Sequence, residues 1–458
     1  MNRDEMTKIA DLKELEAFLV AYPGTQHLDA IFADLCGIFR GKRYPRSDFD
    51  KLFKSGLPIP YTVYWLDVTG ANSDPCGRGF SDGDPDGVAV PISGTLATVP
   101  WSDTPRAQVL MNLREADGSP SMVDPRNVAA VVVERFAELG LRPVLAFELE
   151  FYLLDKERNA DGRPQPPISP MTGRREDSTQ VYGIDELDSF DSFFCEVEQA
   201  NKIQNIPATV ATAEFAPGQY EINLRHVDDP LMAADHCALQ RQVVKRVARR
   251  QGMDATFMSK PFLDETGNGM HIHLSLVDAN GNNVLDDGSE TGSANLRHAI
   301  GGMQALMAEC MGIFAPNVNA YRRFGPNQYV PVNGSWALNN RSAAFRIPAG
   351  DSRDRRIEHR VAGAEANPYL VLACILAAAH HGIVNKIDPG PPSDGNAGAA
   401  VSPDLPLSWQ AAIDRLREAP LLKSYIDSEY LAIYCATKQN EMEKFCSRIS
   451  PLEYDWYL

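Results

Sequence analysis

Two glutamates stand two positions apart in an unusually apolar segment, residues 144–154 (VLAFELEFYLL). Side chains alternate between the faces of a strand, so Glu148 and Glu150 share one face and large apolar side chains fill the other. Carboxylates in such surroundings are costly unless a cation meets them. The segment therefore predicts a cation-binding strand or, alternatively, a half-exposed strand whose acids are solvated.

A second acidic pair flanks a Pro-Gly dipeptide in residues 213–222 (AEFAPGQYEI). If Pro217 and Gly218 form a hairpin turn, Glu214 and Glu221 lie directly opposite each other. Opposed like charges destabilise a sheet unless a counter-ion is present. Pro-Gly favours a type II turn over the tight hairpin turns, so a wider loop is the alternative.

Histidines occur at strand spacing after a glycine-rich loop, in residues 267–275 (GNGMHIHLS). His271, His273 and Ser275 fall on one face, with apolar residues behind them. A single histidine is more often structural. A pair with this spacing also fits a metal or phosphate site.

Arginines and a glutamate alternate near residue 358. Arg356, Glu358 and Arg360 face one way, as a surface salt-bridge ladder or a site for a cation and phosphates would require. No Gly-x-x-x-x-Gly-Lys-Ser/Thr loop occurs, so a nucleotide would be held by metals and arginines. Many carboxylates with one imidazole favour Mg²⁺ or Mn²⁺ over zinc.

The elements that position these residues fall into two parts. Residues 8–21 predict a short amphipathic helix, residues 28–120 predict strands, and the Gly- and Asp-rich segment 70–86 predicts a loop. A helix over 126–139 then begins an alternation of strands and long helices, which places a domain boundary near residue 120. Asn367 and Pro368 predict the start of a buried core helix.

Composition limits the function further. The net charge of −17 argues against nucleic-acid binding. The apolar run at 369–379 is too short to span a membrane, and no signal peptide is visible. Eight scattered cysteines without a Cys-x-x-Cys pair indicate reduced thiols, so we expect a cytoplasmic protein with no membrane contact.

Five motifs together resemble the glutamine synthetase family over nearly the whole chain. They are Glu-x-Glu at 148–150, Pro-Gly-Gln-Tyr-Glu at 217–221, Gly-Met-His-Ile-His at 269–273, Asn-Arg-Ser-Ala at 340–343 and Arg-Ile-Glu-x-Arg at 356–360. The resemblance implies an α+β fold. An N-terminal β-grasp domain (1–120) would precede a catalytic domain (121–458) of antiparallel sheet and flanking helices. It also implies ATP-dependent ligation of the γ-carboxylate of L-glutamate to an amine through γ-glutamyl phosphate.

The resemblance further implies roles for individual residues around two or more Mg²⁺ or Mn²⁺ ions. The first metal would be held by Glu150, Glu214 and Glu221, and the second by Glu148, His271 and Glu358. ATP would meet His273, Ser275, Arg346 and Arg356. Glutamate would meet Glu150, Gly267, Arg323, Arg341 and Arg360, of which Arg341 and Arg360 would also stabilise the transferring phosphate.

The first of two departures from the family pattern concerns the amine. True glutamine synthetases carry a glutamate where Tyr329 stands, and that glutamate binds and deprotonates ammonium. The surrounding residues instead resemble bacterial γ-glutamylputrescine synthetases, so we expect a diamine or polyamine substrate, with ammonium or a monoamine as alternatives. The amine would meet Tyr329, Tyr182, Trp336 and Asp67, and Asp67, Glu214 or Tyr182 would take its proton.

The resemblance also implies a homo-dodecamer of two stacked hexameric rings. Asp67 and Asp86 of one subunit would reach the site of its neighbour, since their loop is expected to have little to do in its own subunit. The tyrosine that some bacterial glutamine synthetases adenylylate is missing near residues 385–400.

Overall fold

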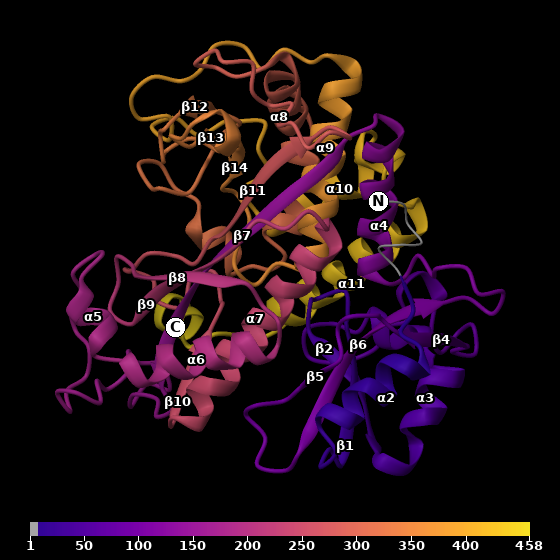
Figure 1. The fold of residues 1–458 in the computed structure, drawn as a ribbon. Helices are drawn as coiled ribbons and strands as arrows, with labels where there is room; N and C mark the ends of the chain where they lie inside the picture. Colours follow the sequence, from indigo (N-terminus) through magenta and orange to yellow (C-terminus); the bar gives the residue numbers. More distant parts are fainter. Residues whose placement is uncertain (1–7) are drawn as a thin grey trace.

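The structure, a computed structural model, describes residues 8–458. Two β-sheets organise the chain, a smaller N-terminal sheet drawn in indigo and purple and a larger sheet drawn in purple to orange (Figure 1). The smaller sheet lies beside α7, and the long helices α8 and α9 lie behind the larger one.

The N-terminal sheet is mixed. Its order is β2-β1-β6-β4-β3, with β5 paired to β6, and only β1 and β6 run parallel. The strands are β1 (His27–Ala33), β2 (Phe39–Pro45), β3 (Leu57–Pro60), β4 (Asp86–Pro91), β5 (Ala97–Thr98) and β6 (Arg106–Arg114). Helices α2 (Leu12–Ala21) and α3 (Phe49–Ser55) accompany it. This arrangement fits the β-grasp type.

Two sequence predictions for this region need correction. The first helix begins at Leu12 and not at residue 8, because the Asp11 side chain caps it by accepting a hydrogen bond from the Glu14 N–H at 3.0 Å. Helix α3 interrupts a segment predicted to hold only strands, since Phe49, Leu52 and Phe53 bury one helical face. The segment 70–86 is mostly loop.

The larger sheet has the order β12-β13-β14-β11-β7-β9-β8, with β10 paired to β7. Its strands pair antiparallel, as expected, except for β12 and β13, which run parallel. Its strands are β7 (Arg142–Asp155), β8 (Ala208–Ala213), β9 (Gln219–Leu224), β10 (Met253–Thr256), β11 (Met270–Val277), β12 (Trp336–Leu338), β13 (Phe345–Ile347) and β14 (Ile357–His359).

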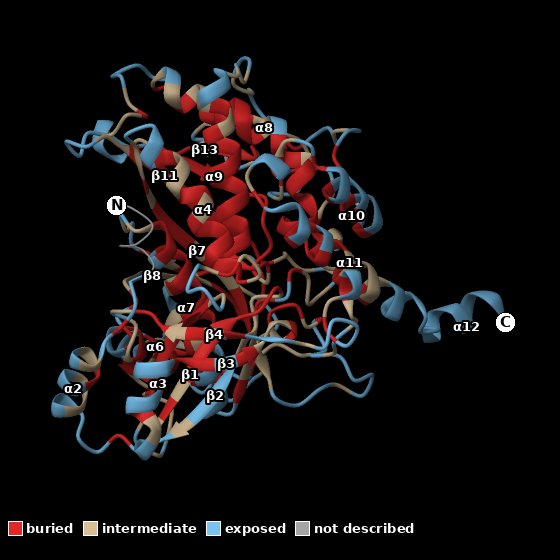
Figure 2. Ribbon diagram, turned by 90° about the vertical axis from the view of Figure 1, so that its right-hand side faces the viewer, coloured by how far each residue is buried: buried red, intermediate tan, exposed pale blue. Residues whose placement is uncertain are grey.

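Helices cover this sheet and extend beyond it. They are α4 (Pro125–Glu138), α5 (Ile184–Asp188), α6 (Asp191–Ile203), α7 (Pro230–Arg250), α8 (Ala294–Phe314), α9 (Pro368–Asn385), α10 (Trp409–Glu418), α11 (Ser428–Cys446) and α12 (Pro451–Tyr457). Figure 2 shows α4, α8 and α9 as largely buried and α12 as an exposed projection at the C-terminus.

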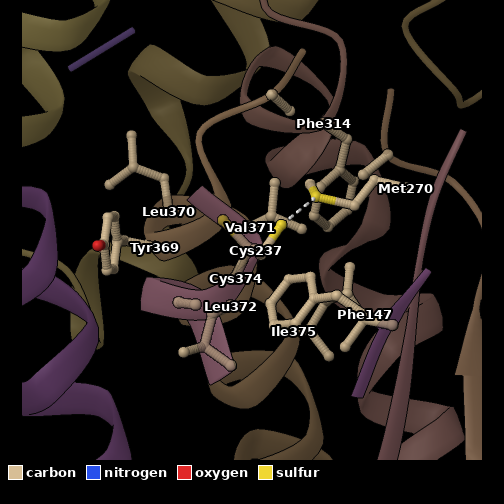
Figure 3. Packing of buried hydrophobic residues seen from close by; sticks show 14 of the residues in the cluster. Phe147, Cys237, Met270, Phe314, Tyr369, Leu370, Val371, Leu372, Cys374 and Ile375 are labelled. Carbon is tan, nitrogen blue, oxygen red and sulfur yellow. Dashed lines mark hydrogen bonds between the residues drawn. The ribbon is translucent and has the colours of Figure 1, made fainter. Parts of the chain in front are cut away.

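The buried core helix predicted at Asn367 is confirmed. Asn367 caps α9 by accepting from the Tyr369 N–H at 3.0 Å, and Pro368 is its first residue. Figure 3 shows Val371, Cys374 and Ile375 of α9 packed near Met270, whose side chain is on the back of β11. Among the described helices, α9 alone is long and apolar enough to cross a membrane, and 78% of that stretch is buried inside the protein.

We propose a domain boundary near residue 120, in the connection between β6 and α4. One of the two hydrophobic clusters supports it, because its buried members all lie between Ala10 and Leu113. The other cluster contains most of the catalytic part and only a few residues from the N-terminal part.

Candidate active site

Strand register brings the motif residues face to face at the centre of the larger sheet. His271 on β11 is directly opposite Glu148 on β7. On the other side of β7, Glu150 is opposite Glu221 of β9. Because side chains two positions apart share a face, these four groups point to the same side of the sheet.

The hairpin that carries the second acidic pair has a wider loop than the two-residue turn considered from the sequence. Glu221 is opposite Thr212, and Glu214 lies opposite Gln219. Gly218 has φ +74° and the Gln219 N–H donates to the Ala216 carbonyl, as a type II turn requires. The predicted opposition of Glu214 and Glu221 is therefore wrong, although both still face the same side as Thr212.

These strands enclose a cavity of about 880 Å³. Most residues singled out from the sequence line it, namely Glu148, Glu150, Tyr182, Glu214, Glu221, Gly267, His271, His273, Arg323, Tyr329, Arg341, Arg346, Arg356, Glu358 and Arg360. Carboxylates, imidazoles and guanidinium groups thus share one solvent-accessible space, which is the arrangement that metal-assisted phosphate chemistry needs.

The end of the cavity at β9 is crowded with acids. Burial and the repulsion of Glu148, Glu150 and Glu214 raise the pKa of Glu221 well above its usual value. Burial and Glu150 also raise the pKa of Glu214 to about 8, against the opposing effect of nearby arginines. The negative charges of these carboxylates are not balanced by nearby positive groups, and a bound cation would balance them.

The end of the cavity at β14 contains its own cations. Glu358 accepts from Arg346 Nη1 at 2.6 Å and from Arg360. Burial opposes ionisation, yet Arg360, the two histidines and Arg346 lower the pKa of Glu358 to about 2. Glu358 is therefore ionised and held in a fixed position.

His273 joins the two ends. Its Nε2 lies 2.8 Å from Glu148 Oε1, and its Nδ1 accepts from Arg356 Nε at 3.1 Å. Burial works against the ionised form, but His273 and His271 lower the pKa of Glu148 well below its usual value. Arg356 thus contacts β11 through a hydrogen bond to the His273 imidazole.

The donor atoms closest to one another form two groups that share Glu148. One contains Glu148, Glu221 and His271, and the other contains Glu148, His273 and Glu358. The family resemblance implied that His271 and Glu358 hold the same metal and that His273 contacts ATP. In the structure Arg346 and Arg360 bind Glu358, and the donor atoms of Glu358 group with those of Glu148 and His273. Oxygen donors with few imidazoles fit hard divalent cations in both groups.

The predicted glutamate-binding residues lie beside the acidic end. A Cβ at Gly267 would stand 2.7 Å from Arg323 Cγ, so only glycine allows this arginine to pass. Arg323 is 4% exposed, and burial lowers its pKa from the usual value. Gly269 donates its N–H to Glu150 Oε2 at 2.6 Å, which fixes that carboxylate at the cavity floor.

Four predicted residues do not line the cavity of their own chain, namely Trp336, Ser275, Asp67 and Asp86. Trp336 is buried, and its indole N–H donates to the Gly390 carbonyl at 3.1 Å. Ser275 lies near the far end of β11, and its hydroxyl donates to the Arg355 carbonyl at 2.9 Å. Neither residue lines this cavity, so the expected contacts of Trp336 with the amine and of Ser275 with ATP stay predictions.

Asp67 is the third, and its loop packs on its own chain. Its carboxylate accepts from Lys444 Nζ at 2.7 Å and from Thr69, and these bonds lower its pKa to about 2 although burial opposes the change. Arg78 in the same loop pairs with Glu429 on α11. The idea that this loop does little in its own subunit is therefore wrong.

An aromatic pair at the cavity was missed in part. Phe215 lies 5.8 Å from Tyr329 between ring centroids, and the two are 49% and 60% exposed. The sequence signal for Phe215 was its position next to Glu214. Strand alternation would place Phe215 on the face opposite to Glu214, but residue 215 lies in the irregular loop after β8, and its side chain lines the cavity. His226 and Lys260 also line the cavity without having been singled out.

Comparison with known proteins agrees with this geometry. The family described as "Glutamine synthetase, catalytic domain" matches residues 122–457. The chain is 40% identical to gamma-glutamylputrescine synthetase PuuA of Escherichia coli (strain K12), over 99% of this chain and 96% of that protein. It is 31% identical to glutamate–isopropylamine ligase of a Pseudomonas species, over 100% and 98% of the two chains.

The fold also matches a solved GmaS/ADP complex. The TM-score is 0.81 at 27% identity, and the match covers 97% of this chain and 99% of the other. Because the family match spans most of the chain and the similarity to relatives spans all of it, the chain belongs to the glutamine synthetase family.

Proposed function

We propose that the protein is an ATP-dependent ligase that joins the γ-carboxylate of L-glutamate to a diamine or polyamine. The observation that favours this amine class is the exposed Phe215–Tyr329 pair beside a cavity of acids and arginines. The similarity to gamma-glutamylputrescine synthetase and to glutamate–isopropylamine ligase supports the same reaction type.

The chemistry explains why acids and arginines are needed together. A carboxylate does not acylate an amine at neutral pH, because oxide is a poor leaving group. Phosphorylation by ATP gives γ-glutamyl phosphate, in which phosphate is a good leaving group. Arg341 and Arg360 line the cavity where they would stabilise the charge that develops on the transferring phosphate.

Divalent cations fit the acidic residues of the cavity. Glu150, Glu214 and Glu221 would hold one, while Glu148, Glu358 and the two histidines offer donors for another. The raised pKa values of Glu214 and Glu221 indicate missing positive charge at the first position. When bound, Mg²⁺ or Mn²⁺ neutralises charge on phosphate oxygens.

The amine must lose a proton before it attacks. An alkylammonium with a pKa near ~10.4 is about 1 part in 2,500 free base at pH 7, a cost of about 4.6 kcal/mol. Glu214 and Tyr182 both line the cavity and are candidates to receive that proton. Phe215 and Tyr329 offer ring faces to the cation, and each contact is worth roughly 0.5–2 kcal/mol.

We also propose a cytoplasmic homo-dodecamer of two stacked hexameric rings, in which Asp67 and Asp86 lie at a subunit boundary. All eight cysteines are free, which suits a reducing compartment. Helix α12 exposes Leu452, Tyr454 and Trp456, which a second subunit would cover (Figure 2). A sedimentation mass equal to one 50.4 kDa chain, with activity retained, would refute the assembly.

The test of the reaction is ADP release by one preparation with ammonium, isopropylamine, putrescine and spermidine. We expect release to require glutamate, a divalent metal and an amine together, with kcat/KM highest for the diamine or the polyamine. If ammonium equals every amine, the protein is a glutamine synthetase. If isopropylamine is best, it is a monoamine ligase.

A further inference from the structure

A second cavity, of about 450 Å³, lies between the N-terminal sheet and the catalytic part. The turn between β1 and β2 forms one wall and a face of α7 forms the other. Figure 1 shows α7 next to the N-terminal sheet. None of the residues that line this cavity lines the catalytic cavity, so its chemistry must be explained separately.

Two of its five basic side chains already have acidic partners. Lys438 Nζ lies 3.0 Å from Glu441 Oε2, and both side chains are 4% exposed. Arg249 Nε lies 3.1 Å from Asp254 Oδ1 at the end of α7. These pairs are electrically neutral and have no need of a ligand.

The other three basic residues, Arg241, Lys245 and Arg246, form no ion pair with any described residue. Arg241 lies about one turn before the adjacent Lys245 and Arg246 on α7, and all three line the cavity. Lys245 has only the ring of Phe257, 5.6 Å from Nζ. One buried acid, Glu365, lies opposite this group, so the cations remain in excess although the whole chain carries −17.

Arg241 is the best evidence that this cavity is a binding site. It is 7% exposed, and its Nη1 donates to the carbonyls of Ala364 and Ala366 at 3.1 Å. Its Nη2 is buried without a partner among residues 8–458. A buried guanidinium nitrogen without an acceptor costs free energy, which an anion in the cavity would recover.

Electrostatics supports the same reading. The Lys245 side chain is exposed at the cavity rim, and partial removal from water together with the charges of Arg241 and Arg249 lowers the pKa of its ammonium group to about 8. Burial also lowers the pKa of Arg241 from its usual value. Both groups are thus held in surroundings that oppose their charge, and an anionic ligand would reverse that effect.

We propose that this cavity binds a small multivalent anion, with two or more carboxylate or phosphate groups on a short carbon skeleton. Groups one helical turn apart are separated by about 5–6 Å, so Arg241 and Lys245 would each meet a different anionic group. Ile38, Phe39 and Ile313 supply apolar contact for the skeleton. The site is separate from the proposed reaction and does not depend on it.

Isothermal titration of the metal-free protein with tricarballylate, a tricarboxylate, tests the proposal. We expect about one site per chain, with an affinity that weakens as salt is added. The double variant Lys245→Gln/Arg246→Gln should bind at least about tenfold more weakly, since a single charged contact exceeds 1.4 kcal/mol. Arg356→Gln in the catalytic cavity is the matched control and should bind within about twofold of wild type.

The result can go clearly against the proposal. No binding by the wild-type protein up to about 10 mM would overturn it. So would loss of binding in Arg356→Gln combined with normal binding in the double variant, because the anion would then occupy the catalytic cavity. Lys245 and Arg246 are exposed at the rim, so the double variant should keep its thermal midpoint and its ADP formation. If the midpoint falls, the two single variants replace it.

Discussion

The two ends of the catalytic cavity are in opposite electrostatic states, although one sheet builds both. At the β9 end, burial and the repulsion of neighbouring glutamates raise the pKa values of Glu214 and Glu221 above their usual value. At the β14 end, Glu358 stays ionised because Arg346 and Arg360 bind it. The first end therefore depends on an added cation, whereas the second end supplies its own.

This difference separates the two tasks that a ligase must perform. The arginine end can accept the negative charge of phosphate without reorganisation, since its guanidinium groups are already fixed. A divalent cation at the acidic end would favour ionisation of Glu214 and Glu221, so metal binding and proton release would be coupled there. Variants that act on one end alone should reveal the separation.

The largest effect is expected at the arginine end. Arg360→Gln should lower kcat by about 10²–10³, the usual cost of removing one donor that stabilises transition-state charge. The metal concentration for half-maximal ADP release should change little. Arg360→Lys is the control and should retain part of the activity, because it keeps the charge but loses the fork of donors. A glutamine variant with wild-type kcat would remove this residue from the reaction.

Substitution of the proposed metal ligands should give the next largest effect. Glu150→Ala and His271→Ala should weaken apparent metal affinity by at least about 100-fold, because even outer partners of ligands cost 10–100-fold. ADP release measured against metal concentration should show partial rescue by excess Mn²⁺. Full activity of both variants in metal-limited buffer would contradict the assignment of these residues.

The aromatic pair tests whether the amine enters at the acidic end, where Phe215 follows Glu214. Tyr329→Glu should raise kcat/KM for ammonium relative to putrescine by about tenfold or more, since it adds a proton acceptor and removes a cation–π contact. Phe215→Ala should lower kcat/KM for putrescine by about tenfold without helping ammonium. Equal changes for both amines would show that these rings only pack the loop.

The smallest effect concerns stability and pH. The pKa of Glu214 is raised to about 8 in the folded protein, above the 4.5 of a free side chain. Its contribution to stability is therefore complete below about pH 4.5 and lost as pH rises toward 8. The thermal midpoint of the metal-free protein should fall by a few °C between pH 5 and 8. Added Mn²⁺ or Glu214→Gln should flatten this slope, and an unchanged slope in Glu214→Gln would assign it to another group.

Side-chain direction was predictable from the sequence because it is set by local alternation. Glu148, Glu150 and His271 could be placed on strand faces from their spacing alone, and the structure puts them in one cavity. Register was harder to predict, because it depends on how many residues a loop contains. Pro217 and Gly218 form a turn within a longer loop, so Glu221 moved opposite Thr212.

Which side chains reach the cavity could not be predicted from pattern. Ser275 shares a strand face with His273 but lies two residues further along β11. Its hydroxyl donates a hydrogen bond to the Arg355 carbonyl there. Trp336 stands close in sequence to Arg341, yet the indole is large and apolar and is buried in the core. Phe215 lines the cavity from an irregular loop, where the alternation of side chains along a strand does not apply.

The central position of β14 in the larger sheet has a consequence for the order of events during synthesis. Glu358 completes the cavity, yet β14 lies between β11 and β13 and is the last of the strands to leave the ribosome. Because chains are made from the N-terminus, the acids of β9 precede the arginines at positions 346 and 360 by about 130 residues of elongation, and those of β7 precede them by about 200. Between the synthesis of β11 and that of β14, about 80 residues later, the nascent chain presents an unpaired edge at β11 that is open to mispairing with another strand.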